Sequence, residues 1–158
     1  MRRKTKEAFT WIVGILRKHS IQFRISGGFA ANIYGSNRPL ADIDIEIPDD
    51  KVLEIQEEVE KYIIYGPKRY TDLEFDLLLM TLKYKGQEID ICGINSLKLF
   101  NKKTRKWTKE RINLSKVTRK KVYDFVVPVI PLKNLIAYKK KISRDVDIQD
   151  VNAIQHNI

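Results

Sequence analysis

The chain has 158 residues, of which 43% are hydrophobic and 32% are charged, and its formal net charge at pH 7 is +10. This length and composition predict one domain with a buried core over residues 1–158 and exclude a disordered chain. The single cysteine, Cys92, excludes an intrachain disulfide, and no apolar run is long enough to span a bilayer. We therefore expect a cytoplasmic protein without a membrane partner.

The first half of the chain is predicted to alternate between helices and strands. Apolar residues at helical spacing predict a helix over 4–19, and a short strand over 22–26 follows it. A short helix is predicted over 29–34, before a strand over 42–47 in which polar and apolar residues alternate. The turn after this strand contains a proline and two aspartates, and it predicts a helix over 51–63.

The second half is predicted to begin with a chain break at Gly66-Pro67 and a hairpin of two strands, 74–84 and 87–91. A strongly basic segment follows the hairpin. The last predicted elements are a strand over 123–130 and helices over 132–142 and 145–155, within a C-terminal helical part (131–158) that packs on the sheet. Because hairpin strands pair antiparallel, these elements predict an α+β fold with a mixed, mainly antiparallel sheet and flanking helices.

Three acidic residues on strands form the most informative pattern. Asp42 and Asp44 lie on one face of their predicted strand, because alternate residues of a strand point the same way. A third acid, Asp90, lies on another apolar strand and would lie beside the pair if the two strands are neighbours. Like charges this close repel, so the cluster favours a bound cation such as Mg²⁺ or Mn²⁺. The alternative for the pair alone is a solvated strand face over an isoleucine core.

Two further features are candidates for phosphate binding. Gly27-Gly28 follows the first predicted strand, where glycine allows close approach of the backbone to a phosphate at a helix N-terminus. The alternative is a tight turn before a helix. Arg38 lies four residues before Asp42 and could contact a phosphate, and the alternative is a position in a surface loop.

The positive charge is concentrated between Lys98 and Lys121. This segment contains eleven of the 30 lysines and arginines and one of the 20 acids, which leaves 19 of each and a neutral remainder. Such a concentration predicts binding to a polyanion such as tRNA or another RNA, and the alternative is a solvated, lysine-rich hairpin. The residues proposed for the polyanion contact are Lys102, Lys103, Arg105 and Lys106.

Together these motifs resemble the nucleotidyltransferase superfamily that shares the palm fold of DNA polymerase beta. The resemblance is carried by Ser26-Gly27-Gly28, Arg38, Asp42-Ile43-Asp44 and Ile89-Asp90-Ile91. The C-terminal stretch over 129–139, with Arg144 and Asp147-Ile148-Gln149-Asp150, is similar to the abortive-infection toxin branch and its small relatives. The sequence departs from the patterns of these relatives at Gly28, Leu40 and Val146, and none of the departures removes an expected metal ligand.

The resemblance implies a role for each motif. Asp42 and Asp44 would bind two magnesium ions together with the phosphates of an NTP. Asp90 would bind the second metal and activate an acceptor hydroxyl. The residues that would hold the nucleotide are Ser26, Gly27, Gly28 and Arg38.

These observations predict a metal-dependent nucleotidyltransferase that moves an NMP group from an NTP to a hydroxyl of RNA, a protein or a small molecule, with a toxin and its cognate antitoxin as one version. The alternative is a non-catalytic module that binds a nucleotide or nucleic acid, or that acts as a toxin–antitoxin partner. Retention of all three acids favours the enzyme, because a binding module has no need for them. A basic nucleic-acid-binding protein would explain residues 98–121 but not the acids.

Overall fold

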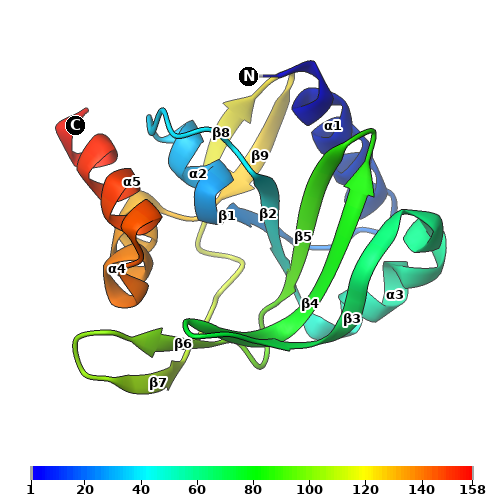
Figure 1. Ribbon diagram of the computed structural model, residues 1–158. Coiled ribbons are helices and arrows are strands. Elements are labelled where there is room, and N and C mark those ends of the chain that lie inside the picture. The colour runs from blue at the N-terminus through cyan, green and yellow to red at the C-terminus, as the bar shows by residue number, and fades with distance from the viewer. Residues whose placement is uncertain (1, 158) are drawn as a thin grey trace.

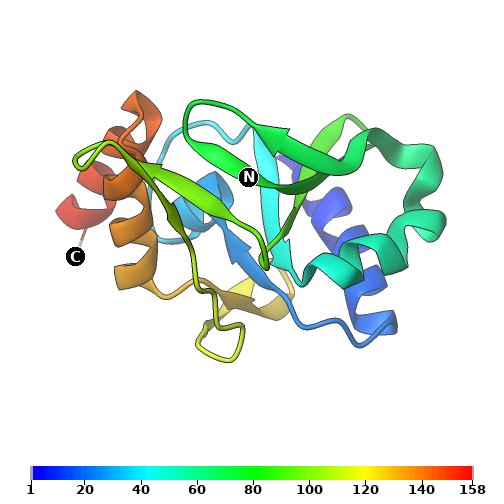
Figure 2. The ribbon, with the colours of Figure 1, turned by 90° about the horizontal axis from the view of Figure 1, so that it is seen from below.

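The computed structural model describes residues 2–157, which form a sheet with helices at both sides (Figure 1). The helices are α1 (Arg3–Lys18), α2 (Gly27–Ile33), α3 (Asp49–Val59), α4 (Leu132–Ile142) and α5 (Asp145–His156), and a 3₁₀ turn over Glu60–Tyr62 follows α3. Helices α4 and α5 stand at one side of the molecule, and α1 and α3 stand at the other (Figure 2). Within residues 2–157, no helix is both long enough and apolar enough to cross a membrane.

The strands form one nine-stranded sheet with the order β7-β6-β4-β5-β2-β1-β9-β8, and β3 pairs with β4 outside this path. The pairs β2–β5 and β1–β9 are parallel, and the other pairs are antiparallel. The predicted α+β class with a mixed, mainly antiparallel sheet is therefore confirmed. The strands are β1 (Arg24–Ser26), β2 (Asp42–Ile47), β3 (Ile63–Thr71), β4 (Phe75–Tyr84), β5 (Gln87–Gly93), β6 (Lys98–Asn101), β7 (Lys106–Lys109), β8 (Thr118–Val122) and β9 (Phe125–Val129).

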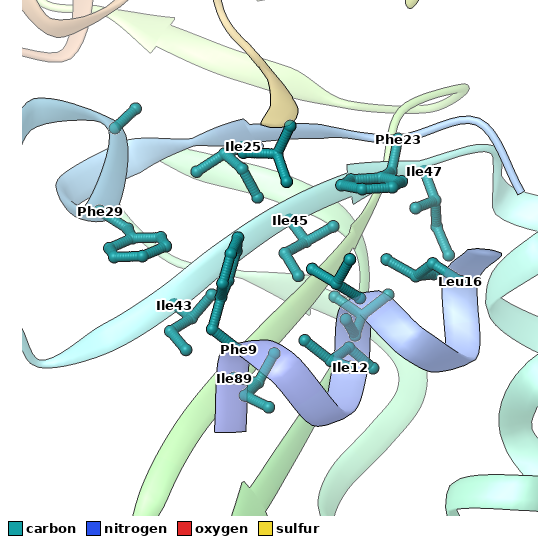
Figure 3. Packing of buried hydrophobic residues seen from close by; sticks show 14 of the residues in the cluster. Phe9, Ile12, Leu16, Phe23, Ile25, Phe29, Ile43, Ile45, Ile47 and Ile89 are labelled. Atoms are coloured by element: carbon teal, nitrogen blue, oxygen red, sulfur yellow. The ribbon is translucent and has the colours of Figure 1, made fainter. Parts of the chain in front are cut away.

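Alternation along β2 separates an apolar face from a polar face. Ile43 and Ile45 are fully buried in the main hydrophobic core. Phe9, Ile12 and Leu16 of α1 recur at helical spacing and pack in the same cluster (Figure 3). Since successive side chains of a strand point to opposite faces, the acids between these isoleucines face away from α1.

Two predictions of secondary structure are wrong. The chain does not break at Gly66-Pro67, because β3 runs through this dipeptide with an irregular register against β4. Gly66 has a φ of +68°, and a Cβ atom there would lie 2.1 Å from the carbonyl oxygen of Leu79, so this approach requires glycine. The predicted helix over 51–63 begins earlier, at Asp49, because Pro48 takes the N-cap position, and it ends at Val59 before the 3₁₀ turn.

The basic segment is divided between two edges of the sheet. Its first part forms the hairpin β6–β7, whereas its last part forms β8, which pairs with β9. Strands β7 and β8 lie at opposite ends of the strand order. The positive charge that is continuous along the sequence is therefore separated in space.

Candidate active site

The three predicted acids meet on the polar face of the sheet. Asp44 of β2 lies directly opposite Asp90 of the neighbouring parallel strand β5, and Asp42 precedes Asp44 by two residues on β2. One carboxylate oxygen from each of the three residues lies within 4.8 Å of the others. Carboxylates at such spacing are the ligands that hard divalent cations prefer, so these residues could hold a metal.

The electrostatics of this cluster disfavour three negative charges. Burial, and then the charges of Asp42 and Asp90, raise the pKa of Asp44 well above its usual value. Burial and the neighbouring Asp42 raise the pKa of Asp90 to about 7, although the Thr81 hydroxyl donates a hydrogen bond of 2.8 Å to Asp90 Oδ1. At neutral pH the cluster therefore retains protons or requires a cation to neutralise it.

The turn between β1 and α2 approaches Asp44 closely. Gly27 has a φ of +58°, and a Cβ atom there would lie 2.2 Å from Asp44 Oδ2, so glycine is required. The backbone N–H of Gly28 donates to the same oxygen at 3.1 Å. Ser26 lies opposite Asp44 in the register of β1 and β2, and its buried Oγ has no hydrogen-bond partner within residues 2–157. This hydroxyl is thus available to a bound group.

Arg38 reaches the site but already has an acidic partner. Its Nε and Nη2 donate to the two carboxylate oxygens of Asp150, at 3.0 and 2.8 Å. Ser36 also donates to Asp150, at 2.7 Å. Nη2 lies beside Gly28, since a Cβ atom at that position would be 2.9 Å from it. Asp150 of α5 therefore holds Arg38 in place. Arg38 also lies at the side of the site that the sequence predicts to bind the nucleotide.

Lys139 is a buried cation that the sequence analysis did not identify. Its ammonium lies 2.9 Å from Asp147 and 3.0 Å from Asp150, and its side chain is 1% exposed. Burial alone would raise the pKa of Asp147, but hydrogen bonds and charge from Arg144 and Lys139 lower it below its usual value. The charge of Lys139 also opposes the rise in the pKa of Asp44, but burial has the larger effect. The available signal was a lysine on the same helical stripe as two core residues, Leu135 and Ile142.

A second buried ion pair lies on β1 and β2, two residues along each strand from the Ser26–Asp44 pair. Arg24 of β1 donates to Glu46 of β2, and both side chains are 8% exposed. Cys92 of β5 lies opposite Glu46, and burial followed by the charges of nearby acids raises the pKa of its thiol. Alternation along β2 places Glu46 on the same face as Asp42 and Asp44, but the sequence does not indicate its partner, because Arg24 lies on a different strand.

A cleft with a volume of about 870 Å³ is lined by the three acids, the glycine turn, Arg38 and the Arg24–Glu46 pair, but not by Lys139. One wall is formed by the turn after β1, and the opposite wall by β3 and β4. Besides Arg24 and Arg38, its lining cations are Arg111 and Lys116, from the segment after β7, and Lys141 and Arg144, from the C-terminal helical part. The polyanion residues proposed from the sequence lie elsewhere, at the exposed tip of the β6–β7 hairpin, and none of the four lines this cleft: Lys102, Lys103, Arg105 and Lys106.

Comparison with solved structures decides the fold family. A candidate nucleotidyltransferase from Thermotoga maritima superposes with a TM-score of 0.75 at 15% identity, over 100% of this chain and 96% of that chain. The chain has the nucleotidyltransferase fold. The lincosamide antibiotic adenylyltransferase LnuA, solved with lincomycin, matches with a TM-score of 0.63 at 14% identity, over 94% of this chain and 95% of that one.

A third solved structure extends this likeness. It is that of ANT(2'')-Ia in complex with adenylyl-2''-tobramycin, which matches with a TM-score of 0.58 at 13% identity over 96% of this chain and 87% of that chain. No protein-family model matches the sequence, and no curated protein matches it either. The nucleotidyltransferase fold of this chain is therefore recognised through structure.

Proposed function

We propose that this protein is a metal-dependent nucleotidyltransferase that moves an NMP group from an NTP to an acceptor hydroxyl. The observation that carries the proposal is the convergence of Asp42, Asp44 and Asp90 beside the Gly27-Gly28 turn. This arrangement occurs in a fold shared with nucleotidyltransferases. In the reaction, the acceptor oxygen forms a bond to the α-phosphorus, the bond to the β-phosphate oxygen breaks, and pyrophosphate leaves.

The donor set fits Mg²⁺ or Mn²⁺. Three carboxylates with no histidine or thiolate among them favour a hard cation, and the raised pKa values of Asp44 and Asp90 mark a site that gains from positive charge. Asp42, Asp44 and Asp90 would hold the metal, which when bound neutralises charge on the phosphate oxygens.

The residues around the acids would position the two substrates. The N–H of Gly28 and the free hydroxyl of Ser26 would donate to phosphate oxygens, and Arg38 would supply charge from a fixed orientation. Asp90 would take the proton of the attacking hydroxyl, because it lies at the side of the acid cluster next to β4 and away from the Gly27-Gly28 turn. Positioning of this kind supplies a large part of catalysis when two substrates must meet in one geometry.

Two classes of acceptor are compatible with this reaction. Structures with the same fold contain lincomycin and an adenylylated tobramycin, which supports a small-molecule hydroxyl as acceptor. An RNA acceptor rests on the basic segment, in which the tip of the β6–β7 hairpin lies outside the cleft while Arg111 and Lys116 line it. A toxin role rests on the likeness of the C-terminal stretch over 129–139 to the toxin branch. We favour the small molecule because the cleft that contains the acids is the place where an acceptor hydroxyl must arrive.

The function can be tested by label transfer. The protein is incubated with Mg²⁺, each of the four NTPs labelled at the α-phosphate, and either total RNA or a panel of hydroxylated small molecules. We expect transfer of the label to a small-molecule acceptor, loss of transfer in Asp44→Asn, and no loss in Asp50→Asn, an exposed aspartate of α3. Equal transfer by wild type and Asp44→Asn would refute the assignment of the site.

A further inference from the structure

Five side chains form one row across the polar face of the sheet. Asp44 lies opposite Asp90, and Ser26 lies opposite Asp44 on the side of β1. Thr81 of β4 lies opposite Asp90 on the other side, and Tyr65 of β3 lies opposite Thr81. All five line the cleft. The row therefore runs from the phosphate-binding turn, across the acids, to the edge formed by β3.

The attacking and leaving groups of the proposed reaction would lie along this row. The donors proposed for the triphosphate, Gly28 and Arg38, lie at the Ser26 end, so the pyrophosphate would leave toward that end. In an in-line displacement, the attacking and leaving oxygens lie on opposite sides of the phosphorus. The attacking hydroxyl must then approach from the opposite end of the row, past Thr81 and Tyr65.

The wall at this end is apolar and aromatic. Tyr65 and Tyr70 meet edge to face with their ring centroids 5.9 Å apart, and Ile64 beside them is 55% exposed. Leu77 and Leu79 of β4 lie beneath the rings in the same apolar cluster. Such a surface suits a ring with an apolar face, as ligand sites usually combine apolar walls with a few polar groups.

The charges of this wall argue against a phosphodiester chain. Among the cleft-lining residues of 63–84, none is a lysine or arginine, and the single acid, Asp72, accepts a hydrogen bond of 2.8 Å from the Tyr70 hydroxyl. The two cations of β3 do not line the cleft. The Lys68 ammonium lies 4.7 Å from the Tyr65 ring centroid, and Arg69 pairs with Asp76. The lining residues of this wall therefore offer a phosphate no ion-pair partner of their own, and the cations in contact with its rings are Lys68 over Tyr65 and Arg144 over Phe75.

We propose that Tyr65 and Tyr70 form the acceptor subsite, and that it takes a small uncharged compound with a hydroxyl-bearing ring, such as a glycoside. The inference rests on the proposed function, because the row acquires a direction only if a triphosphate binds at Gly27-Gly28. Tyr65 and Tyr70 are specificity-determining residues in this account. They select the acceptor by contact with its ring, and they take no part in the transfer of the proton.

The test is binding of a neutral probe, 4-nitrophenyl β-glucoside, measured by saturation-transfer NMR with no turnover required. We expect the wild type to bind the probe and Tyr65→Leu to bind it about fivefold more weakly, the size of effect expected for a lost aromatic contact. The matched control is Tyr84→Leu, because Tyr84 is stacked on Trp11 and lies outside the cleft. Circular dichroism verifies that each variant folds.

Binding of each Mg·NTP by calorimetry separates the possible failures. We expect Tyr65→Leu to bind Mg·NTP as the wild type does. A selective loss of Mg·NTP binding in Tyr65→Leu would show that the rings stack the nucleobase, and it would overturn the inference. Absence of probe binding to the wild type, or equal binding in Tyr65→Leu, would also overturn it. Absence of Mg·NTP binding to the wild type would refute the proposed function itself.

Discussion

The buried charges around the cleft and the exposed charges at the tip of the β6–β7 hairpin behave as two different kinds of region. Lys139 has two fixed carboxylate partners and 1% exposure, whereas Lys103 and Arg105 are exposed and form no ion pair among the described residues. Buried charges cannot be solvated, so each requires a partner or a bound ligand. The comparison teaches that the buried charges carry the larger interaction energies, and that the hairpin adds mainly to the net charge.

The largest effect is expected from removal of Lys139. Lys139→Met leaves Asp147 and Asp150 buried without their shared cation, so the free energy of unfolding should fall by about 3–5 kcal/mol. Urea unfolding measures this change. The neighbouring Lys140→Met is the matched control, because Lys140 is exposed, and it should change stability by less than about 0.5 kcal/mol. Similar values for the two variants would remove the distinction between buried and exposed lysines.

The next effect concerns the acids in the absence of metal. The pKa of Asp90 is raised to about 7 in the folded protein, so ionisation of Asp90 costs stability as the pH rises from about 4 to about 7. Asp90→Asn should therefore be more stable than the wild type at pH 8, by ~2–4 kcal/mol, and the gain should vanish below about pH 4.

Urea unfolding over a pH series in EDTA tests this sign. The control is Asp50→Asn, an exposed position where the difference from wild type should stay small at every pH. Addition of Mg²⁺ should reduce the advantage of Asp90→Asn, because a ligand of the native state stabilises the wild type. A wild type that is more stable than Asp90→Asn in EDTA at pH 8 would contradict the account.

The smallest effect on stability is expected at the hairpin. Replacement of its four basic residues with glutamine should change the free energy of unfolding by less than about 0.5 kcal/mol per site and leave Mg·NTP binding unchanged. If the tip contacts a polyanion, affinity for a 20-mer oligouridylate should fall and its salt slope should flatten by up to about 3 units. Fluorescence anisotropy across a salt series measures both. The replaced residues are Lys102, Lys103, Arg105 and Lys106.

The opposite edge of the sheet supplies the control for this experiment. Arg119→Gln with Lys121→Gln removes exposed charge from β8, and it should leave the salt slope nearly unchanged. An equal loss of RNA affinity in both variants would mean that binding follows net charge alone. Unaltered affinity in the hairpin variant would identify the tip as a solvated hairpin.

The parts of the fold that follow local pattern could be predicted from the sequence. The strand Asp42–Ile47 and the helix Leu132–Ile142 have the predicted bounds, because alternation and helical spacing are local signals. The strand through Gly66 was missed, since its irregular register depends on the approach of the Leu79 carbonyl from another strand. The division of the basic segment between two sheet edges could not be predicted either, because composition does not determine the order of strands in a sheet.

The same limit applies to the candidate site. The three acids and the glycine turn could be identified, because spacing along strands determines which side chains share a face. The partners of charged residues could not: Arg24 meets Glu46 on a neighbouring strand, and Arg38 meets Asp150 from a helix 112 residues later. The wall of Tyr65 and Tyr70 was also missed, because it depends on the pairing of β3 with β4.

The most direct test of the central claim is binding of Mn²⁺ together with an NTP, followed by electron paramagnetic resonance of the ion. This measurement needs no acceptor and reports on the carboxylates themselves. The account predicts that the wild type and Asp50→Asn bind Mn²⁺ with the NTP, and that Asp44→Asn binds it at least tenfold more weakly. Equal Mn²⁺ affinity in the wild type and Asp44→Asn would contradict a metal-dependent nucleotidyltransferase site at these acids.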